Sequence, residues 1–335
     1  MEPDLLDIRG PVLVGRNGEL YLAGGNHSVL RFATGDFRVK PESINNLREN
    51  LRERGEVAAA MGSRFIQIVA PEKYRVVCES FPISNPTSVV EQYYDGGCND
   101  MLDPAALLRA ERAGRTYFRT DTHWAPHGRV VISKIIAEAA GKAAAAVEAA
   151  DAALRASLAE AGQPFLGDLG RKLDPAEGED VLQLRLPHSL RTTENGLSHD
   201  YERPINEGRL VVSESDAATA SGTLLIFGDS YLHQALSYLS FYFSRVVFCR
   251  TRFFHTEMVH MTRPDLVVGQ IAERYLSYVY PDREAPPFLL MPHIMARTPS
   301  ITPEGAKILA SALSAGRKPS FGLFDHLAAP RLAAQ

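Results

Sequence analysis

The order of apolar and polar residues predicts a β-hairpin, a helix and a strand in the first 70 residues. Two short apolar pieces, residues 11–15 and 20–23, flank an Asn-Gly pair at 17–18, and this pair readily takes the positive φ of a tight turn. Across residues 41–61, apolar side chains recur at roughly helical intervals among charged ones, which is typical of an amphipathic helix. Residues 64–70 follow as a β-rich apolar run.

The last third of the chain alternates apolar runs with helix-sized intervals. Residues 223–228, 245–249 and 265–271 have the length and continuity of strands that a parallel sheet buries on both faces. The intervals between them are long enough for helices. This alternation indicates an α/β fold with a mostly parallel, doubly wound central sheet.

The middle of the chain is less regular. Residues 103–114 are expected to form a helix, residues 116–124 to run in extended form, and a second helix to begin at Pro126 and continue into an alanine-rich stretch. From about 150 to 222 the pattern weakens, which predicts an insertion of loops and short strands that forms part of a substrate surface. No repeat or Gly/Ser-rich linker divides the sequence, so residues 1–335 are interpreted as a single domain.

Charge argues against a nucleic-acid partner. The formal net charge is -4 and the sequence pI is near 6.2, so the chain lacks the general basic field that a phosphate backbone requires. A polyanion would need a local patch, for which Arg245, Arg250 and Arg252 are the candidates. Three arginines this close in sequence are more often a solvated surface.

Neither a membrane span nor a cofactor motif is visible. No run approaches the ~20 apolar residues that cross a bilayer, and the acidic amino terminus lacks the pattern of a secretory signal, which favours the cytoplasm. The three cysteines, Cys78, Cys98 and Cys249, form no CxxC pair and allow at most one disulfide. We therefore expect no metal and no cofactor.

A candidate nucleophile follows the apolar run at 223–228. The sequence Gly228-Asp229-Ser230-Tyr231 places a serine at the carboxyl end of a buried strand and the start of a helix, where ligands of open α/β sheets generally bind. Free backbone N–H groups at a helix start can stabilise the oxyanion of an acyl-transfer intermediate. The alternative is that Ser230 only caps the helix.

A candidate base and its partner lie about 100 residues upstream. In the extended segment that we expect here, Asp121 and His123 project to the same side. A carboxylate beside an imidazole fixes its tautomer and stabilises the imidazolium that forms when it takes a serine proton. An ordinary structural histidine is the alternative, but a serine needs a base and a base needs an orienting acid. A metal site of His123 with His127 is disfavoured, because Pro126 places His123 before the helix.

These motifs resemble a known family. Residues 117–124, which contain Asp-Thr-His-Trp, followed by Gly-Asp-Ser-Tyr at 228–231, are similar to the AlgX/AlgJ family of polysaccharide O-acetyltransferases, and further matches extend over roughly residues 10–280. The resemblance implies an SGNH-hydrolase-like fold, a three-layer sandwich in which the motif order is permuted, so that the Asp-x-His pair precedes the serine. It also implies a periplasmic location, in contrast to the amino terminus.

The resemblance also implies roles for individual residues. Ser230 would accept the acetyl group, His123 would act as general base and then acid, and Asp121 would orient it. Tyr275, with Asp229 and Arg250, would bind the oxyanion or the acceptor, and for Tyr275 the alternative is packing under a helix. The implied partners are a polysaccharide or oligosaccharide acceptor and a membrane acyltransferase that supplies acetyl.

Two other functions stay open on the sequence alone. The same acyl-serine released by water would make the protein a carbohydrate acetyl esterase. A non-catalytic polysaccharide-binding or scaffold protein of a biosynthetic complex is the alternative of another class.

Overall fold

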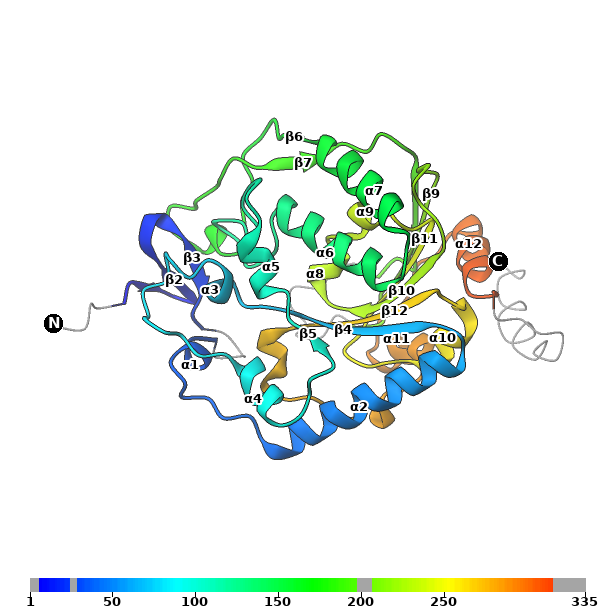
Figure 1. The fold of residues 1–335 in the computed structure, drawn as a ribbon, viewed down its shortest axis with the longest axis horizontal. Coiled ribbons are helices and arrows are strands. Elements are labelled where there is room, and N and C mark those ends of the chain that lie inside the picture. The colour runs from blue at the N-terminus through cyan, green and yellow to red at the C-terminus, as the bar shows by residue number, and fades with distance from the viewer. Residues whose placement is uncertain (1–5, 25–28, 198–206, 316–335) are drawn as a thin grey trace.

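A seven-stranded sheet forms the centre of the structure, a computed structural model that describes residues 6–24, 29–197 and 207–315 (Figure 1). Five neighbouring strands are parallel, and the last two are joined to the sheet by antiparallel pairings, each with the strand before it. The expectation of a mostly parallel sheet is thus confirmed. In spatial order the strands are β5 (Met101–Leu102), β4 (Arg64–Ala70), β12 (Leu266–Ala272), β10 (Thr223–Gly228), β11 (Arg245–Arg250), β9 (Leu210–Ser215) and β8 (Leu190–Glu194).

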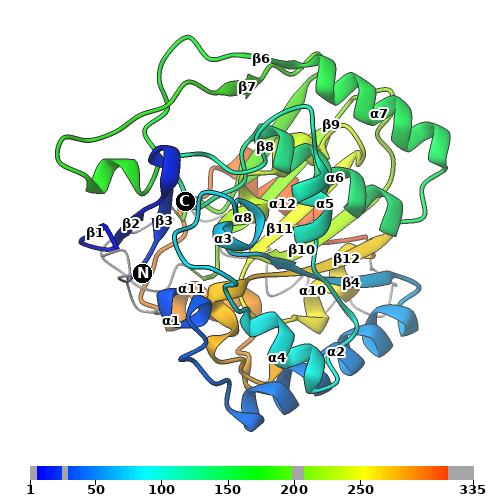
Figure 2. The same ribbon diagram turned by 60° about the vertical axis from the view of Figure 1, so that its left-hand side comes forward.

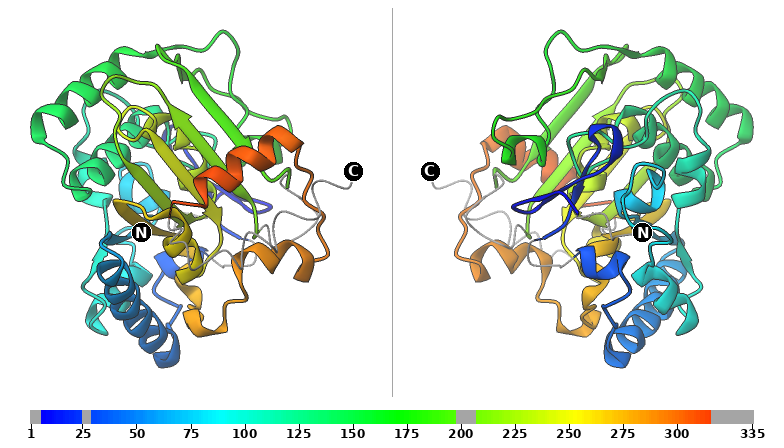
Figure 3. Two further views of the ribbon diagram at one scale, coloured as in Figure 1. Left: turned by 90° about the vertical axis from the view of Figure 1, so that its right-hand side faces the viewer. Right: turned by 90° about the vertical axis from the view of Figure 1, so that its left-hand side faces the viewer.

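Helices cover both faces of this sheet and make three layers (Figures 2 and 3). Along β10, Leu224 and Ile226 pack into one core, while Leu225 and Phe227 pack into another on the opposite face. A strand buried on both faces must be apolar at every position, which explains the continuous run. One face carries α5 (Ala105–Ala110), α6 (Pro126–Ala139), α7 (Ala144–Ala156), α8 (Ser230–His233) and α9 (Leu236–Leu239); the other carries α2 (Pro41–Ala60), α10 (Thr256–Thr262), α11 (Met291–Ile294) and α12 (Pro303–Ala312).

The expected hairpin at the amino terminus is confirmed. Strands β2 (Val12–Val14) and β3 (Leu20–Leu22) pair in antiparallel fashion, and β1 (Ile8–Arg9) adds a third strand. Asn17 and Gly18 have φ of 58° and 71°, the left-handed conformation that this pair favours. The remaining elements are α1 (Val29–Ala33), α3 (Lys73–Val76), α4 (Val89–Asp95), β6 (Leu158–Glu160), β7 (Leu182–Leu184) and the 3-10 turns Arg16–Gly18, Gly170–Lys172, Glu273–Ser277, Asp282–Glu284 and Phe288–Leu290.

Two helix predictions need correction. The helix expected at 103–114 ends at Ala110, because Glu111 is already extended. Gly114 is therefore not a helix cap; a Cβ there would lie 2.2 Å from the His127 ring, so it allows close packing. The alanine-rich stretch forms two helices rather than one, since the chain reverses at Gly141 with φ of 73°.

The segment at 116–124 is not extended as expected. Tyr117 pairs with Trp124 in an isolated antiparallel bridge, so residues 118–123, here called the 118–123 loop, fold back on themselves. The region at 150–222 does consist largely of loops and short strands where it is described. Over the described ranges, no helix is both long and apolar enough to cross a membrane.

Candidate active site

The turn that carries Ser230 is tied to the neighbouring strand. Ser230 follows β10 directly and is the first residue of α8. The Asp229 carboxylate accepts the N–H of Tyr231 at 2.9 Å and the N–H of Ala272 at 2.8 Å. The Asp229 N–H donates in turn to the side-chain oxygen of Gln270 at 3.0 Å. The position of the serine is therefore fixed by contacts to β12 on one side and to its own helix on the other.

The helix after Ser230 is shorter than the sequence suggests. It spans one turn, so its dipole is small. Its cap is the side chain of Asp229 and not that of Ser230, which leaves the serine hydroxyl available for chemistry. The N–H of Ser230 has no intrahelical acceptor at this position, and no hydrogen-bond acceptor takes it within the described ranges.

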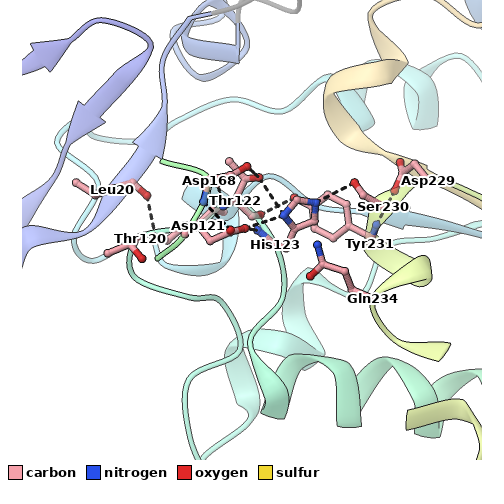
Figure 4. Close-up of polar contacts among 12 residues, drawn as sticks. Leu20, Thr120, Asp121, Thr122, His123, Asp168, Asp229, Ser230, Tyr231 and Gln234 are labelled. Atoms are coloured by element: carbon pink, nitrogen blue, oxygen red, sulfur yellow. Dashed lines mark hydrogen bonds and ion pairs between the residues drawn. The ribbon is translucent and has the colours of Figure 1, made fainter. Parts of the chain in front are cut away.

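The three residues predicted to form a triad are brought together. His123 Nε2 lies 2.8 Å from Ser230 Oγ, although 107 positions separate the two residues. His123 Nδ1 lies 2.7 Å from Asp121 Oδ1. Because an ionised carboxylate only accepts, Nδ1 carries the proton and Nε2 can accept from the serine. Figure 4 shows the chain of contacts from Asp121 to Ser230.

Asp121 and His123 meet through a turn and not through strand alternation. Asp121 Oδ1 also accepts the backbone N–H of His123 at 2.8 Å, as aspartates do where they fold their own backbone into a turn. The other oxygen accepts the N–H of Asp168 at 2.7 Å. Burial alone raises the pKa of Asp121, but its hydrogen bond to His123, the charge of that imidazole and the two backbone donors outweigh it and lower the pKa to about 2. The residue is therefore ionised at neutral pH.

Two acidic residues from the irregular region hold the 118–123 loop. Asp168 accepts from the N–H and the hydroxyl of Thr122 at 2.8 and 2.7 Å. Glu179 accepts from the N–H groups of Arg119 and Thr120 at 2.9 and 2.6 Å. The segment 165–179, here called the acidic cradle, thus satisfies backbone donors of a loop that has no sheet or helix partners.

Asp168 and Glu179 are not among the site residues predicted from the sequence, although their region was expected to form part of a substrate surface. Gly167 and Gly170 lie against the carbonyl of Thr120 and that of Glu177, where an added Cβ would come within 2.2 and 2.1 Å. Glycines spaced among carboxylates weakly indicate that another part of the backbone packs closely against them. The spacing does not indicate which segment of the chain that is.

The metal interpretation gains no support from His127. His127 is the second residue of α6, and its ring lies against Gly114. Burial lowers its pKa. Asp121, His123 and Asp168 do offer ligand atoms within 4.8 Å of one another, but those atoms already bond to each other or to backbone and hydroxyl donors.

The three residues expected to bind the oxyanion or the acceptor lie at the same sheet edge. Both Asp229 oxygens accept backbone N–H groups; since a carboxylate cannot donate, Asp229 positions the turn and does not bind an oxyanion directly. Arg250 pairs in register with Gly228 at the end of β11. Tyr275 is 36% exposed; burial and the charge of Asp229 raise its pKa, and Arg250 opposes them. The roles of Tyr275 and Arg250 stay predictions.

Comparisons with known proteins agree with the geometry. The family model described as "SGNH hydrolase-like domain, acetyltransferase AlgX" matches residues 31–203, which include Asp121 and His123. The chain is 24% identical over 273 residues to the probable alginate O-acetylase AlgJ of Azotobacter vinelandii, covering 74% of this chain and 68% of that protein.

Solved structures show the same fold at low identity. A DHHW family protein from Eubacterium siraeum has a TM-score of 0.54 at 14% identity and covers 88% of this chain and 97% of its own. PatB1 of Bacillus cereus, solved with a sulfonyl adduct, has a TM-score of 0.51 at 14% identity and covers 72% of this chain and 92% of its own.

Proposed function

Since this chain belongs to the family of SGNH hydrolase-like AlgX acetyltransferases, we propose that it transfers acetyl groups to a polysaccharide through an acetyl ester of Ser230. The observation that carries the proposal is the hydrogen-bond chain Asp121–His123–Ser230, with distances of 2.7 and 2.8 Å, at the carboxyl edge of the parallel sheet. A nucleophile, a base and an orienting acid in this order are the requirements of acyl transfer through serine.

In the first half-reaction, Ser230 Oγ attacks the carbonyl carbon of the acetyl donor while its proton passes to His123 Nε2. Ionised Asp121 stabilises the imidazolium. The Ser230 N–H is a donor that can stabilise the oxyanion. The donor's leaving group then departs with the proton from His123, and acetyl-Ser230 remains.

In the second half-reaction, a sugar hydroxyl gives its proton to His123 and attacks the acetyl-Ser230 carbonyl. Ser230 leaves and recovers the proton, so the enzyme returns to its starting state. Water in place of the sugar hydroxyl would give free acetate by the same steps, which is the reaction of a carbohydrate acetyl esterase. Ser230 and His123 are only half-buried, so the acceptor must compete with water at this site.

The acceptor and the donor are proposed from the relatives. AlgJ of Azotobacter vinelandii is named as a probable alginate O-acetylase, which supports a polysaccharide acceptor for this chain. We place Tyr275 and Arg250 at the acceptor side, because both lie at the sheet edge beside the Asp229–Ser230 turn. A membrane acyltransferase is the proposed source of the acetyl group.

The test is a transfer assay that follows acetyl from an activated ester to oligosaccharides and measures free acetate in parallel. We expect acetylated sugar with wild-type protein and neither product with Ser230→Ala. Ser237→Ala is the matched control, because Ser237 lies on α9 and its backbone carbonyl, which the substitution keeps, accepts the hydrogen bond of Ser240. Unchanged turnover in Ser230→Ala would contradict the proposal, and the absence of both products with wild-type protein would favour a non-catalytic scaffold role. Acetate without acetylated sugar would instead favour the esterase.

A further inference from the structure

Tyr231, which follows the nucleophile, reaches across to the loop that carries the base. Its hydroxyl lies 2.7 Å from the backbone carbonyl oxygen of Thr122, the residue between Asp121 and His123. We propose that Tyr231 is a positioning residue that sets the distance between His123 and Ser230 by holding the 118–123 loop against the nucleophile turn. This role rests on the proposed function, since it concerns the same triad.

The direction of each hydrogen bond around the Tyr231 hydroxyl is determined. Arg274 donates to the Tyr231 oxygen at 3.0 Å, and a guanidinium cannot accept. Among the residues that the structure describes, the Tyr231 O–H therefore donates to the Thr122 carbonyl. Arg274 also donates to the carboxylate of Glu72 at 2.7 Å. Glu72 therefore anchors the guanidinium, which donates to Tyr231, and Tyr231 donates in turn to the loop.

The whole chain of bonds is buried. Tyr231 and Glu72 are each 2% exposed and Arg274 is 9% exposed. Hydrogen bonds that are shielded from water are costly to leave unmade, so these contacts hold their geometry. Burial also raises the pKa of Tyr231 far above its ordinary value, which keeps the hydroxyl protonated and able to donate.

The Tyr231 ring reinforces the same connection. Its centroid lies 4.8 Å from that of His123 and 4.9 Å from that of Trp124, with the Trp124 ring edge-on. The ring therefore packs against the base itself and against the residue that follows it. The hydroxyl therefore holds the residue before His123, and the ring packs against His123 and the residue after it.

This connection matters because the two catalytic groups come from separate segments. Among the hydrogen bonds of the described residues, the Tyr231–Thr122 bond joins the 118–123 loop to the Asp229–Tyr231 turn independently of the His123–Ser230 bond itself. Acidic-cradle contacts hold the loop but do not reach the nucleophile. Without the hydroxyl, the loop can drift from the turn, and a displacement of about 1 Å costs as much as ~100-fold in rate.

The experiment compares Tyr231→Phe with Tyr117→Phe. Tyr117 is an equally buried tyrosine that lies beside Trp124. The Tyr117 hydroxyl donates to the Pro71 carbonyl and accepts from the Trp124 indole, and it makes no hydrogen bond to the described residues of the 118–123 loop. Each variant loses one buried hydroxyl. The first readout is the rate constant at which a sulfonyl fluoride modifies Ser230; the second is kcat and KM for an activated acetyl ester.

We expect Tyr231→Phe to lower the modification rate and kcat by about 10-fold or more, with KM changed by less than about two-fold. Tyr117→Phe should leave both rates within about two-fold of wild type at a similar loss of melting temperature. Wild-type rates in Tyr231→Phe, or equal losses in the two variants, would overturn the role of Tyr231.

A second replacement covers the case in which Tyr231→Phe does not fold. The pair Glu72→Gln with Arg274→Met removes the donor to Tyr231 without leaving a buried charge unpaired, and such replacements are often tolerated. We expect a folded protein with a lower modification rate; an unchanged rate would overturn the proposal. Because the sulfonyl fluoride needs no acceptor sugar, a protein that reacts normally but acetylates nothing contradicts the proposed function and not the role of Tyr231.

Discussion

The carboxylate of Asp121 meets three donors, and each fixes a different part of the site. Two come from His123, through its backbone and its ring, and one from the backbone of Asp168. The sequence predicted the pairing of Asp121 with His123 because both stand in one short motif. It predicted the wrong geometry, since a carboxylate that bonds its own backbone makes a turn, and periodicity along a strand does not capture such a bond.

Acid titration should reveal how strongly Asp121 is held. Its pKa of about 2 lies below the ordinary value of 3.8, so the ionised form stabilises the native state above about pH 4 and this contribution is lost as the pH falls toward 2. The difference corresponds to about 2 kcal/mol. Urea unfolding measures the unfolding free energy of wild type and of Asp121→Asn at about pH 5 and at about pH 2.5. Between these two pH values, wild type should lose about 2 kcal/mol more unfolding free energy than Asp121→Asn. Equal losses would show that Asp121 is not held in this way.

At the scale of elements, the strands and the 118–123 loop are encoded differently. Strands β4 and β10 match their apolar runs residue for residue, because burial on both faces leaves a local signature. The 118–123 loop depends on carboxylates that lie 46 and 59 positions away, in the acidic cradle. A contact of this kind leaves no periodic pattern, and so Asp168 and Glu179 could not be predicted.

Removing one cradle carboxylate should loosen the loop. Asp168→Ala leaves the N–H and the hydroxyl of Thr122 without their acceptor, which should cost about 1–3 kcal/mol of unfolding free energy and reduce activity. Asp180→Ala is the matched control, because Asp180 is an exposed aspartate of the same region. Thermal unfolding and the ester assay together measure both effects. If Asp168→Ala and Asp180→Ala had the same stability and activity, the acidic cradle would not be what holds the 118–123 loop.

In the whole molecule, the amino-terminal hairpin and the active site share one buried cation. Lys73 donates to the carbonyls of Leu20 and Arg119, both at 2.8 Å, and pairs with Glu19 at 2.9 Å. Burial lowers the pKa of Lys73 to about 8, against the opposing charge of Glu19. The hairpin was predictable from its turn, but its attachment to the 118–123 loop was not, since a lone lysine in sequence is expected at the surface.

Breaking this attachment should destabilise the protein strongly. Within the described part of the chain, Lys73→Met leaves Glu19 with the more exposed Arg115 as its ion-pair partner, and loss of one member of a buried pair costs about 3–5 kcal/mol. Replacing both residues, Lys73→Met with Glu19→Gln, should recover part of that loss. A double-mutant cycle in urea measures the coupling. Additive effects would mean that the pair does not join the hairpin to the core.

The acetyl-enzyme itself is the most direct test of the account. Protein mixed with an activated acetyl ester and quenched in acid should carry the acetyl group on Ser230, located by tandem mass spectrometry of its peptides. His123→Ala should abolish this label, while His127→Ala, a change of the neighbouring histidine on α6, should largely retain it. Turnover without acetyl-Ser230, or equal labelling in His123→Ala and wild type, would contradict the account.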